Sequence, residues 1–159
     1  MKISEFTVAA TGRQVTCRLG SPDEKVRAAE PGLVLALRLT ADDERIAGVA
    51  GIAPVTDWRI LKEFEEVRER DDVAALALKH RAASLAGRPV YLAIGSHDHR
   101  VGTHACVDLA HAILECEEPE AEGESQLNLH VVDSPGHTLE RPWRERGVRF
   151  LLNLVSWSC

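Results

Sequence analysis

The sequence predicts an α/β fold: a mostly parallel sheet with flanking helices, preceded by an N-terminal antiparallel hairpin. From residue 46 onward, short apolar runs typical of strands alternate with helical segments. The runs at 46–53 and 90–95 are almost continuously apolar, as expected for strands buried on both faces of a parallel sheet. A chain of 159 residues has room for a single domain of this kind, spanning residues 1–159.

The first 31 residues predict a hairpin followed by a surface loop. Two β-prone runs, 5–10 and 14–20, are joined by Thr11-Gly12-Arg13, which predicts an antiparallel hairpin over residues 5–20. The polar stretch 21–31 is bounded by prolines and predicts a loop.

Residues 32–40 fit either a buried strand or a helix. Their apolar run suits a strand, but Leu33, Leu37 and Ala41 fall on one helical stripe after Pro31, a residue typical of a first helical turn. A strand at 46–53 can be parallel to its neighbour only after a crossover. This topological requirement favours a helix over 31–41.

The segment 57–86 predicts a charged helical insertion. A helix is expected over 57–69 with Asp57 as its cap, and a second over 72–85, ended by Gly87 and Pro89. The many acidic and basic residues here are typical of a solvated helix face with ion pairs between successive turns.

Residues 89–155 complete the alternation of strands and helices. The predicted elements are strand 90–95, helix 103–117 with Thr103 as N-cap, an acidic loop at 117–124, strand 127–132 and helix 139–155.

Charge and composition exclude several classes of function. A net charge of −6 lacks the basic footprint of a nucleic-acid-binding protein. No apolar run approaches the roughly 20 residues that a membrane span needs. The N-terminal residues MKISEFTV do not resemble a secretion signal, and the four cysteines form no CxxC pair. We therefore expect a cytoplasmic protein with free thiols, no cofactor, and no nucleic-acid or membrane partner.

Polar residues follow two of the predicted strands. Asp98 lies in the segment after strand 90–95, and His137 lies in the segment after strand 127–132. Neighbouring parallel strands lie about 5 Å apart, so loops at the same end of such strands can meet. A buried carboxylate that orients a histidine, with the histidine as general base, is the pair a nucleophilic hydrolase needs. Alternatively, Asp98 could be an ordinary capping or loop residue and His137 an exposed one.

These segments resemble part of a known superfamily. Gly95, Asp98 and Val101 after a strand, then a helix, a strand and the loop Ser134-Pro135-Gly136-His137-Thr138, are similar to the C-terminal half of an α/β-hydrolase. The nearest branch is that of dienelactone hydrolases and prolyl oligopeptidases, which segment 49–58 also resembles. The resemblance covers residues 44–155 and implies that Asp98 is the triad acid and His137 the triad base. The implied substrate is a small-molecule ester or a peptide-like compound, cleaved at an acyl bond.

The family's nucleophile elbow, G-x-S-x-G, does not occur in this sequence, and neither does an oxyanion-hole motif of the HG type. Residues 30–51 read like two family segments joined, which implies a shortened hydrolase. The candidate nucleophiles are Ser96 and Ser134, which flank the acid and the base, and the cysteines Cys106 and Cys17. None lies in the strained turn that exposes a hydrolase serine.

Two alternatives belong to other classes. The first is a catalytically inactive relative or interaction module, for which unpaired strand edges and apolar patches predict homo-oligomers. The second is a metal site built from closely spaced histidines and aspartates. Its candidate ligands are His97, Asp98, His99, His104, Asp108 and His111.

Overall fold

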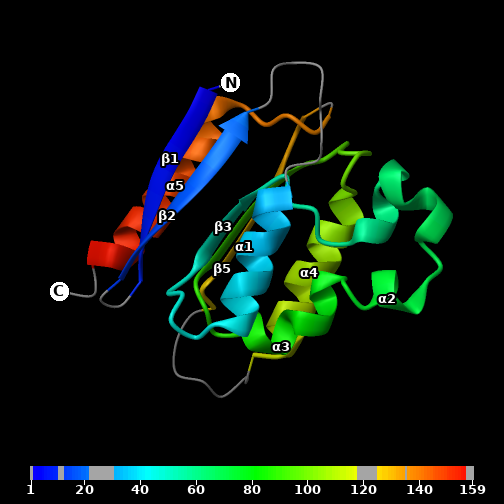
Figure 1. Ribbon diagram of the computed structural model, residues 1–159, viewed down its shortest axis with the longest axis horizontal. Coiled ribbons are helices and arrows are strands. Elements are labelled where there is room, and N and C mark those ends of the chain that lie inside the picture. The colour runs from blue at the N-terminus through cyan, green and yellow to red at the C-terminus, as the bar shows by residue number, and fades with distance from the viewer. Residues whose placement is uncertain (1, 11–12, 22–30, 118–124, 135, 157–159) are drawn as a thin grey trace.

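The computed structural model describes residues 2–10, 13–21, 31–117, 125–134 and 136–156. Its centre is a parallel three-stranded sheet of β3 (Val49–Ile52), β4 (Val90–Gly95) and β5 (Leu127–Val132), in the order β3-β4-β5. Helices flank this sheet on both faces (Figure 1). The predicted α/β class with a mostly parallel sheet is therefore confirmed.

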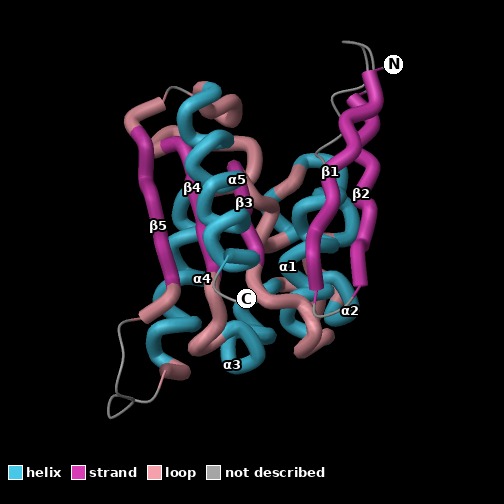
Figure 2. The backbone as a smooth tube through the Cα atoms, turned by 90° about the vertical axis from the view of Figure 1, so that its left-hand side faces the viewer, coloured by secondary structure: helices cyan, strands magenta, loops and turns pink. Residues whose placement is uncertain are grey.

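The N-terminal strands form a separate antiparallel pair. β1 (Lys2–Ala10) pairs with β2 (Arg13–Ser21) in a continuous register from Ala10 opposite Arg13 to Lys2 opposite Ser21. The hairpin is longer than the predicted 5–20 and lies along one side of the molecule (Figures 1 and 2). Its turn and the predicted loops at 21–31 and 117–124 lie largely outside the described residues.

Side chains alternate between the two faces of the central strand, as the two-residue period of a β-strand requires. Val90, Leu92 and Ile94 of β4 belong to the larger hydrophobic core. Tyr91 and Ala93 belong to a smaller core on the opposite face. The sheet is thus buried on both sides, which explains the continuous apolar sequence of β4.

Different helices supply the two cores. The larger core includes Leu37 of α1 (Pro31–Asp42) and Leu109 of α4 (Thr103–Glu115). The smaller core is closed by two aromatic residues of α5 (Arg141–Ser156), Trp143 and Phe150. The helix predicted over 139–155 begins two residues later, at Arg141.

The ambiguous segment 32–40 is helical, as the crossover argument predicts. The helix α1 ends beside Arg88, whose guanidinium donates to the backbone carbonyls of Thr40, Asp43 and Ile46. These bonds satisfy the Thr40 carbonyl in the last turn of α1 and join the helix end to the chain that leads into β3. The strand β3 is shorter than the predicted 46–53, and the Ile46 carbonyl is bonded to Arg88 instead of to a strand. Ala53, with φ of 49°, donates a last hydrogen bond to Ala93 of β4 as the strand ends.

The two helices predicted over 57–69 and 72–85 are wrong as continuous α-helices. The segment consists of short pieces: the 3₁₀ helices η1 (Trp58–Ile60), η2 (Lys62–Val67) and η3 (Leu78–Arg81), and the α-helices α2 (Asp71–Ala74) and α3 (Ala82–Leu85).

Tertiary packing explains the breaks in this segment. Leu61, Leu78 and Leu85 are all at most 1% exposed in the larger core. Leu61 and Ala77 are extended, with ψ near 130°, and each lies between two successive short helices. Extended residues at these points let each leucine reach the core, so burial overrides the helical propensity of the sequence.

Hydrogen bonds hold the segment to the turn after β3, both at its beginning and at the start of η3. Asp57 caps η1 by accepting from the Arg59 N–H at 3.0 Å, as the sequence predicts. The Leu78 N–H donates to the Thr56 carbonyl at 2.9 Å. Residues 57–77 therefore form a loop whose two ends are hydrogen-bonded together.

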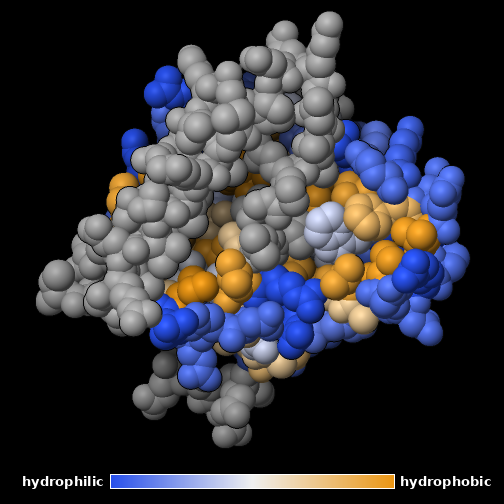
Figure 3. Space-filling view, in the orientation of Figure 1, coloured by the Kyte–Doolittle hydropathy of each residue, from blue (hydrophilic) through white to orange (hydrophobic). Residues whose placement is uncertain are grey.

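Some apolar surface stays exposed. In the described part of the chain, Val131 of the edge strand β5 and Val148 and Leu152 of α5 are about half exposed or more. Hydrophobic and hydrophilic residues lie next to one another over the face shown in Figure 3. The self-association expected from open sheet edges stays a prediction. None of the helices in the described residues has the length and apolar character needed to cross a membrane.

Gly147 marks the close packing of α5 on the sheet. An alanine Cβ at this buried position would lie 3.4 Å from Ile52 Cδ1 and 3.5 Å from both Ala50 Cβ and Tyr91 Cδ1, which is ordinary contact. Glycine inside a helix costs about 1 kcal/mol relative to alanine. Gly147→Ala should therefore raise the free energy of unfolding by about 1 kcal/mol in urea denaturation followed by circular dichroism. A loss of stability would contradict this packing of α5.

Candidate functional site

The structure brings Asp98 and His137 together. Asp98 follows β4 and His137 follows β5, and the two strands are adjacent and parallel. The Nδ1 atom of His137 lies 2.9 Å from Oδ2 of Asp98, although the residues are 39 positions apart in the sequence. The Asp98 side chain is fully buried, whereas the His137 side chain is 36% exposed. The contact therefore joins an inner carboxylate to an outer imidazole.

The second oxygen of Asp98 is held by backbone amides. Oδ1 accepts from the N–H groups of Arg100 at 3.0 Å and Val101 at 3.1 Å. Burial alone would raise the pKa of Asp98, but the hydrogen bonds from His137 and these amides outweigh it. The pKa of Asp98 therefore lies below its ordinary value of 3.8, and the side chain is a carboxylate at neutral pH.

A carboxylate only accepts hydrogen bonds, so this geometry assigns the proton on His137 to Nδ1. The other ring nitrogen, Nε2, then carries a lone pair. A histidine held in this tautomer by a buried aspartate can take a proton from a nucleophile and later return it to a leaving group. The pair can therefore act as a general base and acid.

Thr103 fixes the loop that carries Asp98. Its hydroxyl donates to the Gly95 carbonyl at 2.6 Å and accepts from the Asp98 N–H at 3.3 Å. The sequence predicts Thr103 as the N-cap of the following helix, but Gly102 occupies the cap position and Thr103 is the first helical residue. The hydroxyl is used across the turn between β4 and α4 and not for capping.

Gly95 lets the His137 loop approach the end of β4. A Cβ atom on Gly95 would lie only 2.6 Å from the carbonyl oxygen of Gly136 and 3.3 Å from the Ser134 Cβ. Only a residue without a side chain fits there. The glycine thus determines how close His137 comes to Asp98.

Neither candidate serine is hydrogen-bonded to His137 in the described part of the structure. The Ser96 hydroxyl lies 2.9 Å from Nδ1 of the neighbouring His97. Ser134 is buried, and its hydroxyl donates to the Gly136 carbonyl at 3.3 Å. The expectation that either serine could approach His137 is therefore not met by these hydrogen bonds.

Of the two candidate cysteines, the structure describes the side chain of Cys106 but not that of Cys17. Cys106 is fully buried in α4, and burial, assisted by the Asp98 charge, raises the pKa of its thiol to about 12. It is therefore a neutral thiol at physiological pH and a poor nucleophile. Cys17 lies in β2, and its side chain is outside the described part of the structure.

The metal alternative finds no support at the predicted ligands. No three histidine, cysteine, aspartate or glutamate side chains come together to hold a metal ion within the described ranges. Asp98 is committed to His137 and to two amides, while His97 contacts Ser96. His99, His104 and His111 are exposed.

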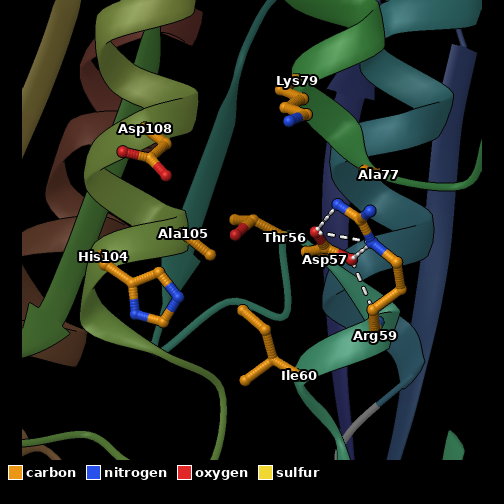
Figure 4. A pocket seen from close by; sticks show the side chains of 9 residues that line it. All are labelled: Thr56, Asp57, Arg59, Ile60, Ala77, Lys79, His104, Ala105 and Asp108. Carbon is orange, nitrogen blue, oxygen red and sulfur yellow. Dashed lines mark hydrogen bonds and ion pairs between the residues drawn. The ribbon is translucent and has the colours of Figure 1, made fainter. Parts of the chain in front are cut away.

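A cavity lies at the same end of the sheet, beyond the carboxyl end of β3, and the sequence analysis does not predict it. A cavity of about 210 Å³ opens between the turn after β3, the region around η3 and the first turns of α4 (Figure 4). Neither Asp98 nor His137 lines it. Thr56 and Asp57 follow β3 just as Asp98 follows β4, so their position at the carboxyl end of a strand is the signal that could have indicated it.

Comparisons with known proteins assign no family to the chain. No known protein family matches the sequence, and a search of curated proteins finds no significant match. The geometry of the site is therefore the main basis for inferring its function.

Proposed function

We propose that the chain is an α/β-hydrolase-like protein that cleaves ester or peptide-type acyl bonds, with Asp98 as acid and His137 as base. One observation supports this proposal most: the 2.9 Å contact between His137 Nδ1 and the buried Asp98 carboxylate at the ends of adjacent parallel strands. In this function, Nε2 of His137 removes the proton of the attacking hydroxyl. Asp98 stabilises the resulting imidazolium.

The orientation of the pair suits this role. Two backbone amides and His137 hold the Asp98 carboxylate in one position, so the imidazole is oriented before a substrate arrives. The His137 side chain is 36% exposed, so the imidazole is not sealed inside the protein. Preorganisation of this kind is what makes a histidine an effective general base.

The test is labelling with a fluorophosphonate, which reacts covalently with activated serines, followed by peptide mass spectrometry to locate the adduct. We expect one labelled serine in the wild type and no label in His137→Ala. Hydrolysis of p-nitrophenyl acetate should fall at least about 100-fold in that variant. The matched control is His99→Ala, which removes an exposed histidine of the loop after β4 and should leave both signals unchanged.

A second candidate function is a catalytically inactive relative of such enzymes. The observation that favours it is the engagement of Ser96 with His97 and of Ser134 with the Gly136 carbonyl. The same experiment separates the two: a folded wild type that neither takes up the label nor hydrolyses the ester would overturn the hydrolase proposal. Turnover retained in His137→Ala would overturn the assignment of the base.

A further inference from the structure

The cavity at the end of β3 is lined by both buried and exposed residues, which Figure 4 labels. Its floor is formed by small buried residues, Thr56, Ala77 and Ala105. Its rim carries exposed charged or polar side chains, Lys79, His104 and Asp108. A volume of about 210 Å³ suits a small molecule rather than a polymer segment.

The floor contains a polar group without a partner. Thr56 is 3% exposed, and its Oγ1 atom makes no hydrogen bond to any described residue. Figure 4 shows this side chain directed into the cavity. A buried hydroxyl without a partner is unfavourable, and most such groups in proteins are satisfied. A bound molecule with a hydrogen-bonding group at this point would satisfy Thr56.

Opposite charges lie on opposite walls. Asp57 is already paired with Arg59, whose Nε and Nη2 atoms lie 2.9 Å and 2.5 Å from its two carboxylate oxygens. Lys79 and Asp108 form no ion pair with any residue that the structure describes, and Figure 4 shows them on different sides of the cavity. Lys79 also lies close enough to Asp57 for its charge to lower the pKa of that carboxyl. Because Arg59 already holds the Asp57 carboxylate, the Lys79 ammonium and the Asp108 carboxylate are the charged groups of the lining that have no ion pair among the described residues.

We propose that this cavity binds a small zwitterion, an α-amino acid with a short aliphatic side chain. Its carboxylate would meet the Lys79 ammonium and the Thr56 hydroxyl, and its ammonium group would meet Asp108. The aliphatic part would lie against Ile60 and the two floor alanines. The proposal is independent of the Asp98–His137 pair, which does not line the cavity.

The first test is a titration of ¹⁵N-labelled protein with L-valine, followed by NMR. Two probes each lack one charge of L-valine: isovalerate lacks the ammonium group and isobutylamine lacks the carboxylate. We expect saturable shifts at the amides of Thr56, Ala77 and Ala105, and binding at least tenfold weaker for both single-charge probes. No saturation by L-valine at about 20 mM, well above a Kd of about 1 mM, would overturn the proposal. Equal binding of the three probes would also overturn it.

Variants of the wall residues supply the second test. Lys79→Gln, Asp108→Asn and Thr56→Val should each weaken L-valine binding at least fivefold. Lys62→Gln, an exposed lysine of the same insertion that does not line the cavity, is the matched control and should bind as the wild type does. Lys79 and Asp108 are exposed, so their variants keep the test valid if Thr56→Val fails to fold. Unchanged L-valine binding in both Lys79→Gln and Asp108→Asn would overturn the proposal. So would the finding that only water, and no amino acid, is hydrogen-bonded to the Thr56 hydroxyl.

Discussion

Replacing Asp98 with alanine should lower the free energy of unfolding by about 3 kcal/mol at pH 7. The variant leaves the N–H groups of Arg100 and Val101 without their acceptor and deprives His137 of its partner. Urea denaturation followed by circular dichroism measures the loss. Asp133→Ala, which removes an exposed carboxylate from the loop that carries His137, is the control and should change stability by less than about 0.5 kcal/mol.

The effect of Asp98→Ala should depend on pH in a defined direction. The pKa of Asp98 is lower in the folded chain than its ordinary value of 3.8. A carboxyl group of this kind stabilises the fold above about pH 4 and loses that contribution as the pH falls through its folded pKa. The difference between wild type and variant should therefore shrink as the pH falls below about 4. A difference that stays constant over this range would show that the charge of Asp98 contributes nothing to the fold.

Replacing Gly95 with alanine should separate His137 from Asp98. The new Cβ would lie 2.6 Å from the Gly136 carbonyl oxygen, a backbone atom that can move only with its loop. We expect a loss of about 2 kcal/mol in unfolding free energy, as is typical when atoms are forced into a packed site. The ¹⁵N NMR signal of His137 Nδ1 should change as it does in Asp98→Ala, because both variants break the same hydrogen bond.

Gly136→Ala is the matched control for this substitution. It adds the same methyl group to the facing loop, where a Cβ would meet nothing within 4 Å. Its stability and its His137 signal should stay close to those of the wild type. If Gly95→Ala kept the wild-type His137 signal, Gly95 would not be the residue that determines the approach of the two loops.

The sequence predicts most of what positions the Asp98–His137 pair. Strands 90–95 and 127–132 are predicted with their observed bounds, the first from its continuous apolar run and the second from its place in the alternation of strands and helices. Parallel pairing of these strands then places the loops after them at the same end of the sheet, where they can meet. The contact between Asp98 and His137 follows from topology, although its length and the amides that support it do not.

The sequence fails where tertiary contacts decide the local structure. The charged segment 57–86 has the composition of helices, yet Leu61 and Leu78 reach the core only through extended residues between short helices. Likewise, threonine is a residue typical of an N-cap, but the Thr103 hydroxyl donates its hydrogen bond to the Gly95 carbonyl instead. The cavity beside Thr56 depends on how this broken segment packs against α4, and periodicity carries no information about that packing.

The bond between Leu78 and Thr56 has a consequence for how this protein can vary in length. The hydrogen bond from Leu78 to Thr56 joins the two ends of residues 57–77. The positions of the strands should therefore not depend on how many residues lie between those ends. Doubling such a loop costs only about 0.6 kcal/mol in closure entropy. The exposed stretch around Glu69 and Arg70, away from the buried Leu61, is where added residues would be tolerated. An insertion at this point should therefore leave both the strand ends and their side chains in place.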